Sequence, residues 1–163
     1  MLGWLGLAVV VVLFDQLTKT WVVATLPFRH RIELLPFFNL THVHNTGAAF
    51  SFLSDAGGWQ RWFFLGLALV ASVVIVAWLR RLPKTARLEA FSLTLVLGGA
   101  LGNFIDRLRF GYVIDFLDFH LGGWHWPAFN LADAAITIGV VLLLWEGVRG
   151  RESNTVTEER HGS

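Results

Sequence analysis

The chain has 163 residues, of which 55% are hydrophobic and only 15% are charged, and its mean hydropathy is +0.57. Soluble domains carry about a quarter of charged residues, so this composition indicates an integral membrane protein with one helical unit. The net charge of +1, with basic residues in short clusters, leaves no electrostatic case for nucleic-acid binding. The lack of cysteine excludes disulfides, thiolate catalysis and Cys-based metal sites.

Four apolar stretches are long enough to cross a bilayer, which takes roughly 20 mostly apolar residues. They cover about residues 2–24, 59–79, 88–104 and 131–148. Because an unpaired backbone group is costly in hydrocarbon, each stretch is predicted to be a helix. The first has no basic residue before its apolar run, and the run is too long for a secretory signal, so we expect a mature transmembrane helix.

Two long connections, about residues 25–58 and 107–130, are rich in aromatic residues and in short runs typical of strands. Residues 31–34 and 38–43 are predicted to be strands, with Pro36 as a break between them. Tryptophans near these connections suit the membrane–water boundary, because an indole ring is partly apolar and partly polar. We therefore expect a small, partly β platform on the outer leaflet.

Basic residues predict the orientation in the membrane. The short linker 80–87 holds four Lys and Arg residues, so the positive-inside rule places it in the cytoplasm. Both termini then face the cytoplasm, and both long connections lie outside. Residues 151–163 are polar and mixed in charge, and are predicted to be a disordered cytoplasmic tail. Residues 1–150 form a single membrane domain in this prediction.

Ionisable and amide side chains fall at one depth of this topology, near the outer boundary. In chain order they are Asp15, Lys19, Asn45, Asn103, Asp106, Arg107, Asp115, Asn130 and Asp133. The spacing of four puts Asp15 and Lys19 on one helix face. A charged residue costs roughly 2.5–3.5 kcal/mol at the bilayer centre and less near the interface. Several such costs at one depth indicate a functional site.

Simpler interpretations of the same residues stay open. Asp15 and Lys19 could be a neutralising pair within one helix. Asp106 and Arg107 could anchor the end of the third helix. Asp133 could be an N-cap or first-turn acid that the helix dipole stabilises.

Metal and nucleophile chemistries are less well supported. His42 and His44 alternate, so on a strand they would share a face, and with His120 or His125 they could form a metal site. There is no His-Glu-x-x-His motif and no carboxylate at ligand spacing, so we expect no metal and no cofactor. The sequence also lacks a nucleophile elbow, a P-loop and a dinucleotide fingerprint. Asp118 is predicted to lie in a surface loop, outside any site.

The remaining chemistry belongs to Asp115 and Asp133, which lie next to apolar runs at the membrane edge. Two facing carboxylates repel each other when both are ionised, so the pKa of one rises and the pair shares a proton. The ionised member can take a proton from water, and the neutral member can donate one to a carbonyl or a leaving amine. This is the chemistry of an aspartic protease, which needs no metal.

Five blocks of sequence lie in a fixed order along the four spans. They are residues 15–19 (Asp-Gln-Leu-Thr-Lys), 45–50 (Asn-Thr-Gly-Ala-Ala-Phe), 98–107 (Gly-Gly-Ala-Leu-Gly-Asn-Phe-Ile-Asp-Arg), 112–116 (Tyr-Val-Ile-Asp-Phe) and 129–133 (Phe-Asn-Leu-Ala-Asp). With these blocks in this order, the chain resembles the signal peptidase II family, the lipoprotein signal peptidases of bacterial inner membranes. Each block alone is a weak signal, but the five together are highly specific.

The resemblance implies a membrane all-α fold: four transmembrane helices, a small periplasmic β-cradle and a short periplasmic helix. It implies an aspartic endopeptidase that cuts prolipoproteins just before a diacylglyceryl-modified cysteine and releases the signal peptide. Asp115 and Asp133 would be the catalytic dyad. The residues that bind substrate or support the site would be Asp15, Lys19, Asn45, Gly47, Asn103, Arg107 and Asn130.

The family also implies a location in the bacterial inner membrane, an active site near the periplasmic face, and inhibition by the cyclic peptide globomycin. The partners would be lipid-modified prolipoproteins and membrane lipid, without nucleic acid, and we expect a monomer. The chain departs from the family at one position. Many relatives carry Ser directly after the second catalytic Asp, whereas this chain has Ala134, so a hydroxyl has no role there.

Two other functions stay open at the level of sequence. A small proton-coupled transporter could use Asp15, Lys19, Asp115 and Asp133 as a relay. Such a relay needs polar residues through the whole depth of the membrane, and the span 59–79 offers almost none. A non-catalytic lipid-binding scaffold would be indicated if variants of both aspartates at 115 and 133 kept their function.

Overall fold

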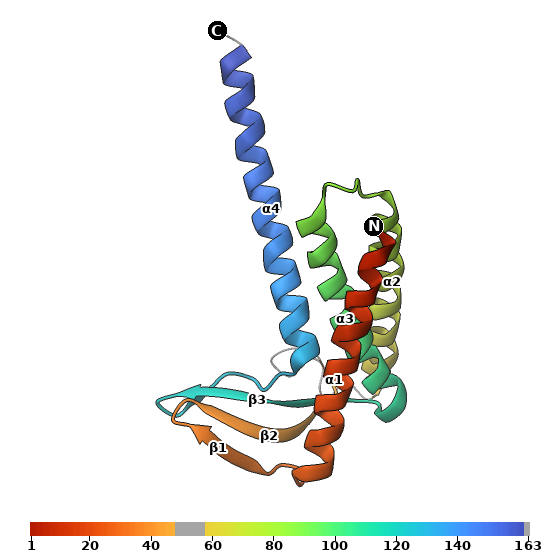
Figure 1. Cartoon of the computed structure of the whole chain (residues 1–163). Coiled ribbons are helices and arrows are strands. Elements are labelled where there is room, and N and C mark those ends of the chain that lie inside the picture. Colours follow the sequence, from red (N-terminus) through yellow and green to blue (C-terminus); the bar gives the residue numbers. More distant parts are fainter. Residues whose placement is uncertain (48–57, 162–163) are drawn as a thin grey trace.

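Four long helices form the membrane part of the molecule (Figure 1). The computed structural model describes residues 1–47 and 58–161, with side chains as far as residue 149. The helices are α1 (Leu5–Thr25), which follows a 3-10 turn at Leu2–Trp4, α2 (Trp59–Arg81), α3 (Arg87–Phe110) and α4 (Leu131–His161). All four are long and apolar enough to span a bilayer, which confirms the four predicted helices.

The third helix is longer than the sequence predicts. The sequence predicts that the apolar run ends at about residue 104 and that Asp106 and Arg107 end the helix, but α3 continues to Phe110. The polar side chains that follow the apolar run bond to groups inside the protein, so they do not need to leave the helix. The helix ends at Gly111, which has φ +87° and donates its N–H to the carbonyl of Arg107. Glycine adopts this left-handed conformation without strain.

A four-stranded antiparallel sheet lies at one end of the helices (Figure 1). Its strands, in spatial order, are β1 (Arg31–Leu35), β2 (Phe38–Asn45), β3 (Val113–Leu121) and β4 (Trp124–His125). The first two strands confirm the prediction, and Pro36 lies between them. β3 was not predicted as a separate strand. The described residues contain no short helix beside this sheet of the kind that the resemblance implies.

α3 is the central helix and packs against the other three. Glycines make the close approach possible. A Cβ atom on Gly99 would overlap the carbonyl oxygen of Ala132 in α4, and one on Gly102 would lie 2.6 Å from a carboxylate oxygen of Asp15 in α1. Small residues at such points let helix backbones approach in a membrane. They let α1 and α4 pack closely against the half of α3 that leads to the sheet.

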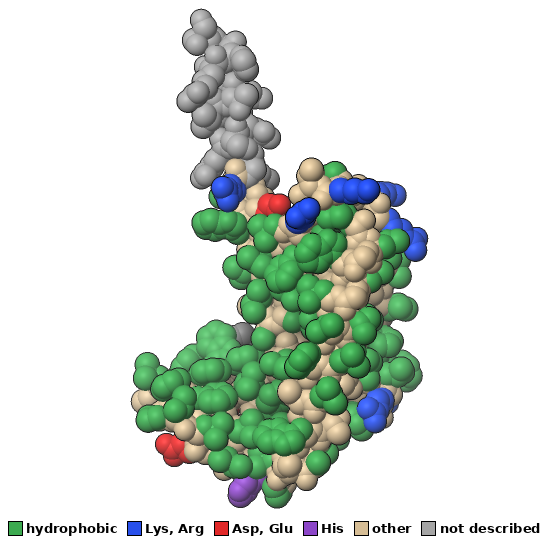
Figure 2. Space-filling view, in the orientation of Figure 1, with side chains coloured by type: hydrophobic (Ala, Val, Ile, Leu, Met, Phe, Trp, Pro, Cys, Tyr) green, Lys and Arg blue, Asp and Glu red, His purple; other side chains and the backbone are tan. Residues whose placement is uncertain are grey.

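The surface of the molecule is divided by polarity. On the face that Figure 2 shows, hydrophobic side chains cover the flanks of the helices and much of the sheet, and a group of Lys and Arg lies at the helix ends opposite the sheet. Leu17 on α1 is 65% exposed and Val73 on α2 is 62% exposed. Such a continuous apolar surface is favourable against lipid and unfavourable in water.

α4 is also longer than expected. The sequence predicts disorder from residue 151, whereas the backbone of α4 is helical to His161. Residues 151–161 contain neither proline nor glycine, so nothing in this stretch breaks a helix. The helix therefore runs on beyond the apolar span, which ends at Arg149.

Candidate active site

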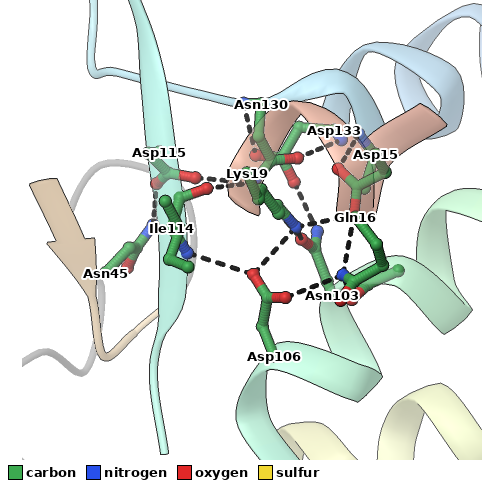
Figure 3. A network of polar contacts seen from close by, with 12 residues as sticks. Asp15, Gln16, Lys19, Asn45, Asn103, Asp106, Ile114, Asp115, Asn130 and Asp133 are labelled. Atoms are coloured by element: carbon green, nitrogen blue, oxygen red, sulfur yellow. Dashed lines mark hydrogen bonds and ion pairs between the residues drawn. The ribbon is translucent and has the colours of Figure 1, made fainter. Parts of the chain in front are cut away.

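Polar side chains from three helices and two strands meet at the ends of the helices that lie next to the sheet (Figure 3). Every site residue predicted from the sequence belongs to one connected network of contacts. In order of contact these residues are Asp15, Lys19, Asn103, Asp133, Asn130, Asp115, Asn45, Gly47 and Arg107. The prediction that these groups lie at one depth therefore matches the arrangement in the structure.

Asn130 connects the two aspartates of the expected dyad (Figure 3). Its Nδ2 donates to Oδ1 of Asp115 at 2.6 Å, and its Oδ1 accepts the backbone N–H of Asp133 at 2.9 Å. Its own backbone N–H lies 3.4 Å from Oδ2 of Asp133. The reciprocal contacts between Asn130 and Asp133 have the pattern of a capping box at the start of α4. One buried amide therefore orients both carboxylates.

Asp133 is held from a second direction by α3. Its Oδ1 accepts a hydrogen bond of 2.7 Å from Nδ2 of Asn103. Asp133 is not the N-cap, because Asn130 is the residue whose side chain caps α4. Asp133 is the acid of the first turn, as the other half of the simpler interpretation states. The capping geometry instead holds the carboxylate of Asp133 at the edge of a cavity.

Asp115 lies in β3 and is only 1% exposed. Its second oxygen, Oδ2, accepts a bond of 3.0 Å from Nδ2 of Asn45, at the end of β2. Burial, together with the charge of Asp133, raises the pKa of Asp115 to about 7, against the smaller opposing effect of its bonds to Asn45 and Asn130. A pKa this far above the ordinary value leaves part of Asp115 protonated near neutral pH.

Asp15 and Lys19 form more than a neutralising pair. Nζ of Lys19 lies 2.8 Å from Oδ2 of Asp15 and 2.9 Å from Oδ2 of Asp106, and it also donates to Oδ1 of Asn103 at 3.0 Å. The three donors of the ammonium group thus have three acceptors. The three ionisable side chains are at most 2% exposed. Asp106 is therefore part of a buried ion cluster and not a simple helix-end anchor.

The role of Asp106 was not assigned from the sequence. A signal was present, because Asp106 follows Asn103 by three positions and so shares its face of α3. Gln16 was also missed: its Nε2 donates to Oδ1 of Asp106 at 2.8 Å and to the carbonyl of Gly102 at 3.2 Å. Both residues link α1 to α3 beneath the dyad.

Arg107 and Gly47 lie at the other end of the network. Nη2 of Arg107 donates to the carbonyl of Gly47 at 2.8 Å, and the N–H of Gly47 donates to Oδ1 of Asn45 at 3.0 Å. The guanidinium carbon lies 4.8 Å from the centre of the Phe64 ring in α2. This cation–π contact connects the positive charge beside the dyad to a neighbouring helix.

A cavity of about 660 Å³ opens beside the dyad. Its polar lining comes from Asn45, Asn103, Arg107, Asp133 and Thr137. The apolar lining includes Trp126, Pro127, Phe129, Ile136 and Ile138. A ligand in this cavity would meet carboxylate and amide groups together with a hydrophobic wall.

The position of Asp118 differs from the prediction. It does not lie in a surface loop but in β3, and it is 3% exposed. It accepts bonds from Nδ2 of Asn39 at 2.9 Å and Nδ1 of His125 at 2.8 Å, and it pairs with Nε of Arg31 at 3.2 Å. Burial alone would raise the pKa of Asp118, but these three partners outweigh it and hold the pKa below its usual range. The prediction failed because β3 was not recognised.

Four of the six histidines lie in two separate pairs. Nε2 of His44 lies 3.2 Å from Nε2 of His42, and the rings of His120 and His125 stack with centroids 4.9 Å apart. Within residues 1–47 and 58–149, no three His, Asp or Glu side chains are grouped so that they could hold a metal ion.

Solved structures show the class of protein that this fold defines. Two bacterial membrane enzymes determined by the in meso method superpose closely on the chain. One has a TM-score of 0.84 at 33% identity, covering 93% of this chain and 90% of that one. The other has a TM-score of 0.77 at 34% identity, covering 88% and 91%. With its four spans, the chain is a multi-pass bacterial membrane enzyme.

Sequence comparisons identify the family. The model of the signal peptidase (SPase) II family matches residues 7–149. Lipoprotein signal peptidases of Burkholderia thailandensis and Burkholderia vietnamiensis are each 58% identical over 146 residues, which cover 90% of this chain and 87% of the relatives. The chain belongs to the signal peptidase II family and is a peptidase. The resemblance drawn from the five sequence blocks is thereby confirmed, and the transporter and scaffold alternatives lose their basis.

Proposed function

We propose that this protein is an aspartic endopeptidase that removes the signal peptide from diacylglyceryl-modified prolipoproteins by cutting just before the lipidated cysteine. The name of the 58% identical relatives, lipoprotein signal peptidase, supports the substrate class. The observation that carries the chemistry is that Asp115 and Asp133 both bond to the single residue Asn130 beside a large cavity.

The two carboxylates have different environments, which suggests different roles. Asp115 is buried and its pKa is raised to about 7, so it holds the shared proton and donates it to the carbonyl oxygen of the scissile peptide. Asp133 lines the cavity, and amide donors from Asn103 and Asn130 bond to its carboxylate and favour its charged form. It takes a proton from the attacking water as the new C–O bond forms, and later passes this proton to the leaving amine. As the C–N bond breaks, Asp115 recovers its proton from a hydroxyl of the tetrahedral intermediate, which restores the dyad. This sequence of transfers needs no metal and no cofactor.

The surroundings of the dyad suit a substrate that is anchored in lipid. The apolar wall of the cavity, with Phe129 and Ile136, can lie against the hydrophobic part of the substrate while its acyl chains stay in the bilayer. Anchoring aligns the peptide before it reacts and so lowers the entropic cost of positioning. Asn45 and Arg107 line the same cavity and can hold the peptide backbone or stabilise developing negative charge.

The proposed orientation places the sheet and the dyad at the periplasmic face of the inner membrane. Four Lys and Arg residues lie in the short stretch 80–87 that joins α2 to α3, at the helix ends opposite the sheet (Figure 1, Figure 2). By the positive-inside rule that end is cytoplasmic, so both termini are cytoplasmic. We further propose a monomer, because all predicted site residues come from one chain.

The test uses Asp115→Asn and Asp133→Asn, purified in lipid and incubated with a lipidated precursor. Each variant is expected to lose at least about a hundredfold in rate, because loss of one member removes a general acid or base. The matched control is Asp118→Asn, the same change at a buried carboxylate three positions along β3, which should process the precursor normally. Near-normal cleavage by either dyad variant would falsify the proposal.

A further inference from the structure

The two acids of the buried ion cluster make a matching pair of contacts to the backbone (Figure 3). Oδ1 of Asp15 accepts the backbone N–H of Ala132 at 3.0 Å. Oδ2 of Asp106 accepts the backbone N–H of Ile114 at 3.1 Å. Ala132 directly precedes Asp133, and Ile114 directly precedes Asp115. Each acid therefore holds the peptide unit that leads into one aspartate of the dyad.

Lys19 joins the two acids into one unit. Its Nζ lies 2.8 Å from Asp15 and 2.9 Å from Asp106, so a single ammonium group fixes the separation of the two acceptors. The unit is rigid because Asp15 and Lys19 lie in α1 while Asp106 lies in α3, and both helices extend well beyond the site. Hydrogen bonds to charged acceptors are roughly twice as strong as neutral ones.

We propose that Asp15, Lys19 and Asp106 form a clamp that sets the distance between the two dyad carboxylates. The clamp acts through hydrogen bonds from the backbone N–H of the residue that precedes each dyad aspartate. The residues of this clamp are positioning residues, and only the dyad touches the reacting atoms. The inference rests on the proposed function, since it assigns the clamp to the same dyad. It makes Asp106 as important for Asp115 as Asp15 is for Asp133.

The charge of the cluster favours this role over simple neutralisation. One acid would neutralise Lys19, but the cluster buries two acids with one base. A second buried acid is costly at a membrane boundary unless it makes contacts that need its charge. The second acid here is the one that holds Ile114. Without Asp106, the residue that precedes Asp115 in β3 would have no charged partner on α3.

The experiment compares Asp106→Ala, Asp106→Asn and Thr20→Val on a lipidated precursor, with kcat, KM and the pH profile as readouts. Alanine removes both the charge and the acceptor, whereas asparagine removes the charge but keeps an oxygen for the N–H of Ile114. Thr20 lines the same small cavity as Asp106, but its hydroxyl bonds to the backbone of its own helix, so its variant controls for packing.

Asp106→Ala is expected to lower kcat about a hundredfold with little change in KM, the cost of displacing a reacting group by about 1 Å. The alkaline limb of its pH–activity profile should move to lower pH, because Asp115 without its backbone contact is less buried and lies farther from Asp133. The other charges that act on Asp115, Lys19 from α1 and Arg107 from α3, stay in place. Asp106→Asn should keep the alkaline limb of the unmodified protein and lose less rate, and Thr20→Val should resemble the unmodified protein.

A second variant keeps the test decisive if Asp106→Ala does not fold. Replacing the amide of Ile114 by an ester, through incorporation of the corresponding hydroxy acid, removes only the N–H that Asp106 accepts. It should reproduce the fall in kcat and the shift of the alkaline limb. The clamp is overturned if folded Asp106→Ala or the ester variant keeps normal kcat and limb, or if alanine and asparagine behave alike. Failure of the dyad proposal itself would show differently, as activity in Asp115→Asn.

Discussion

At the scale of single residues, Asn130 does the most to organise the site. Its side chain caps α4 and bonds to Asp115, and its backbone faces Asp133, while it has no exposed surface of its own. A buried amide with every polar atom bonded is held in one orientation, and it imposes that orientation on its partners. The chemical difference between the two dyad acids then follows from their surroundings, because Asp115 is enclosed and Asp133 lines a cavity.

The pH dependence of Asp115 is a prediction at this scale. Its folded pKa of about 7 lies above the ordinary value of 3.8, so protonation favours the folded state. This contribution to the free energy of unfolding is fully present below pH 3.8, declines above it, and is lost once the pH passes about 7. Activity should fall on the alkaline side of the same pKa, because the dyad then loses its shared proton.

Asp133→Asn removes the neighbouring charge and should lower the pKa of Asp115. Burial is the larger cause and remains, so the value should stay above 3.8. The measurement is a carboxyl-specific infrared or carbon-13 NMR titration, with Asp118→Asn used to assign the other buried carboxyl. An unchanged or higher pKa in Asp133→Asn would mean that the two carboxylates do not interact.

At the scale of elements, the sheet is held together by a second buried carboxylate. Asp118 on β3 bonds to Asn39 on β2 and His125 on β4, and it pairs with Arg31 on β1. One side chain therefore contacts all of the remaining strands of the sheet. The lowered pKa of Asp118 means that the folded state favours its ionised form. Its stabilising effect is therefore present above pH 3.8 and is lost as the pH falls through the lower folded value.

Asp118→Asn should accordingly lower the unfolding temperature at neutral pH, with a loss of about 1–3 kcal/mol, as expected when a buried charged acceptor is removed. The difference from the unmodified protein should shrink under acidic conditions. Thermal unfolding at several pH values measures this effect, and Glu33→Gln on exposed β1 is the control. A difference that grows on acidification would contradict the assignment.

At the scale of the whole molecule, the two ends of the helices have separate tasks. The sheet, the dyad and the cavity lie at one end, and the basic connection between α2 and α3 lies at the other (Figure 1, Figure 2). The family match ends at residue 149, where the apolar span of α4 also ends. We therefore keep the proposal that residues 1–150 form the peptidase unit and that 151–163 are a cytoplasmic extension, although α4 is helical to His161.

Truncation after Gly150 tests this division. The shortened protein should insert into the membrane and cleave the lipidated precursor at the full-length rate, because the removed segment lies at the end of α4 far from the dyad. The values of kcat/KM for the two proteins measure the effect. A large loss of activity in a folded, inserted truncation would make the extension part of the enzyme.

The amino-acid sequence by itself determined the four spans and the pair of strands around Pro36, because apolar length and turn residues act locally. It also indicated the candidate site residues, since polar side chains at a membrane boundary are costly and are therefore functional candidates. It missed the end of α3, the burial of Asp118 in β3 and the contribution of Asp106. Only the tertiary structure decided these, because each depends on partners far along the chain.

The pairing of Asp15 with the N–H of Ala132 spans 117 positions, and that of Lys19 with Asn103 spans 84. No local pattern encodes such contacts. They arise when Gly99 and Gly102 let three helices approach closely enough for short polar side chains to meet. Local periodicity thus set the elements, and close packing of the helices made two distant aspartates into neighbours.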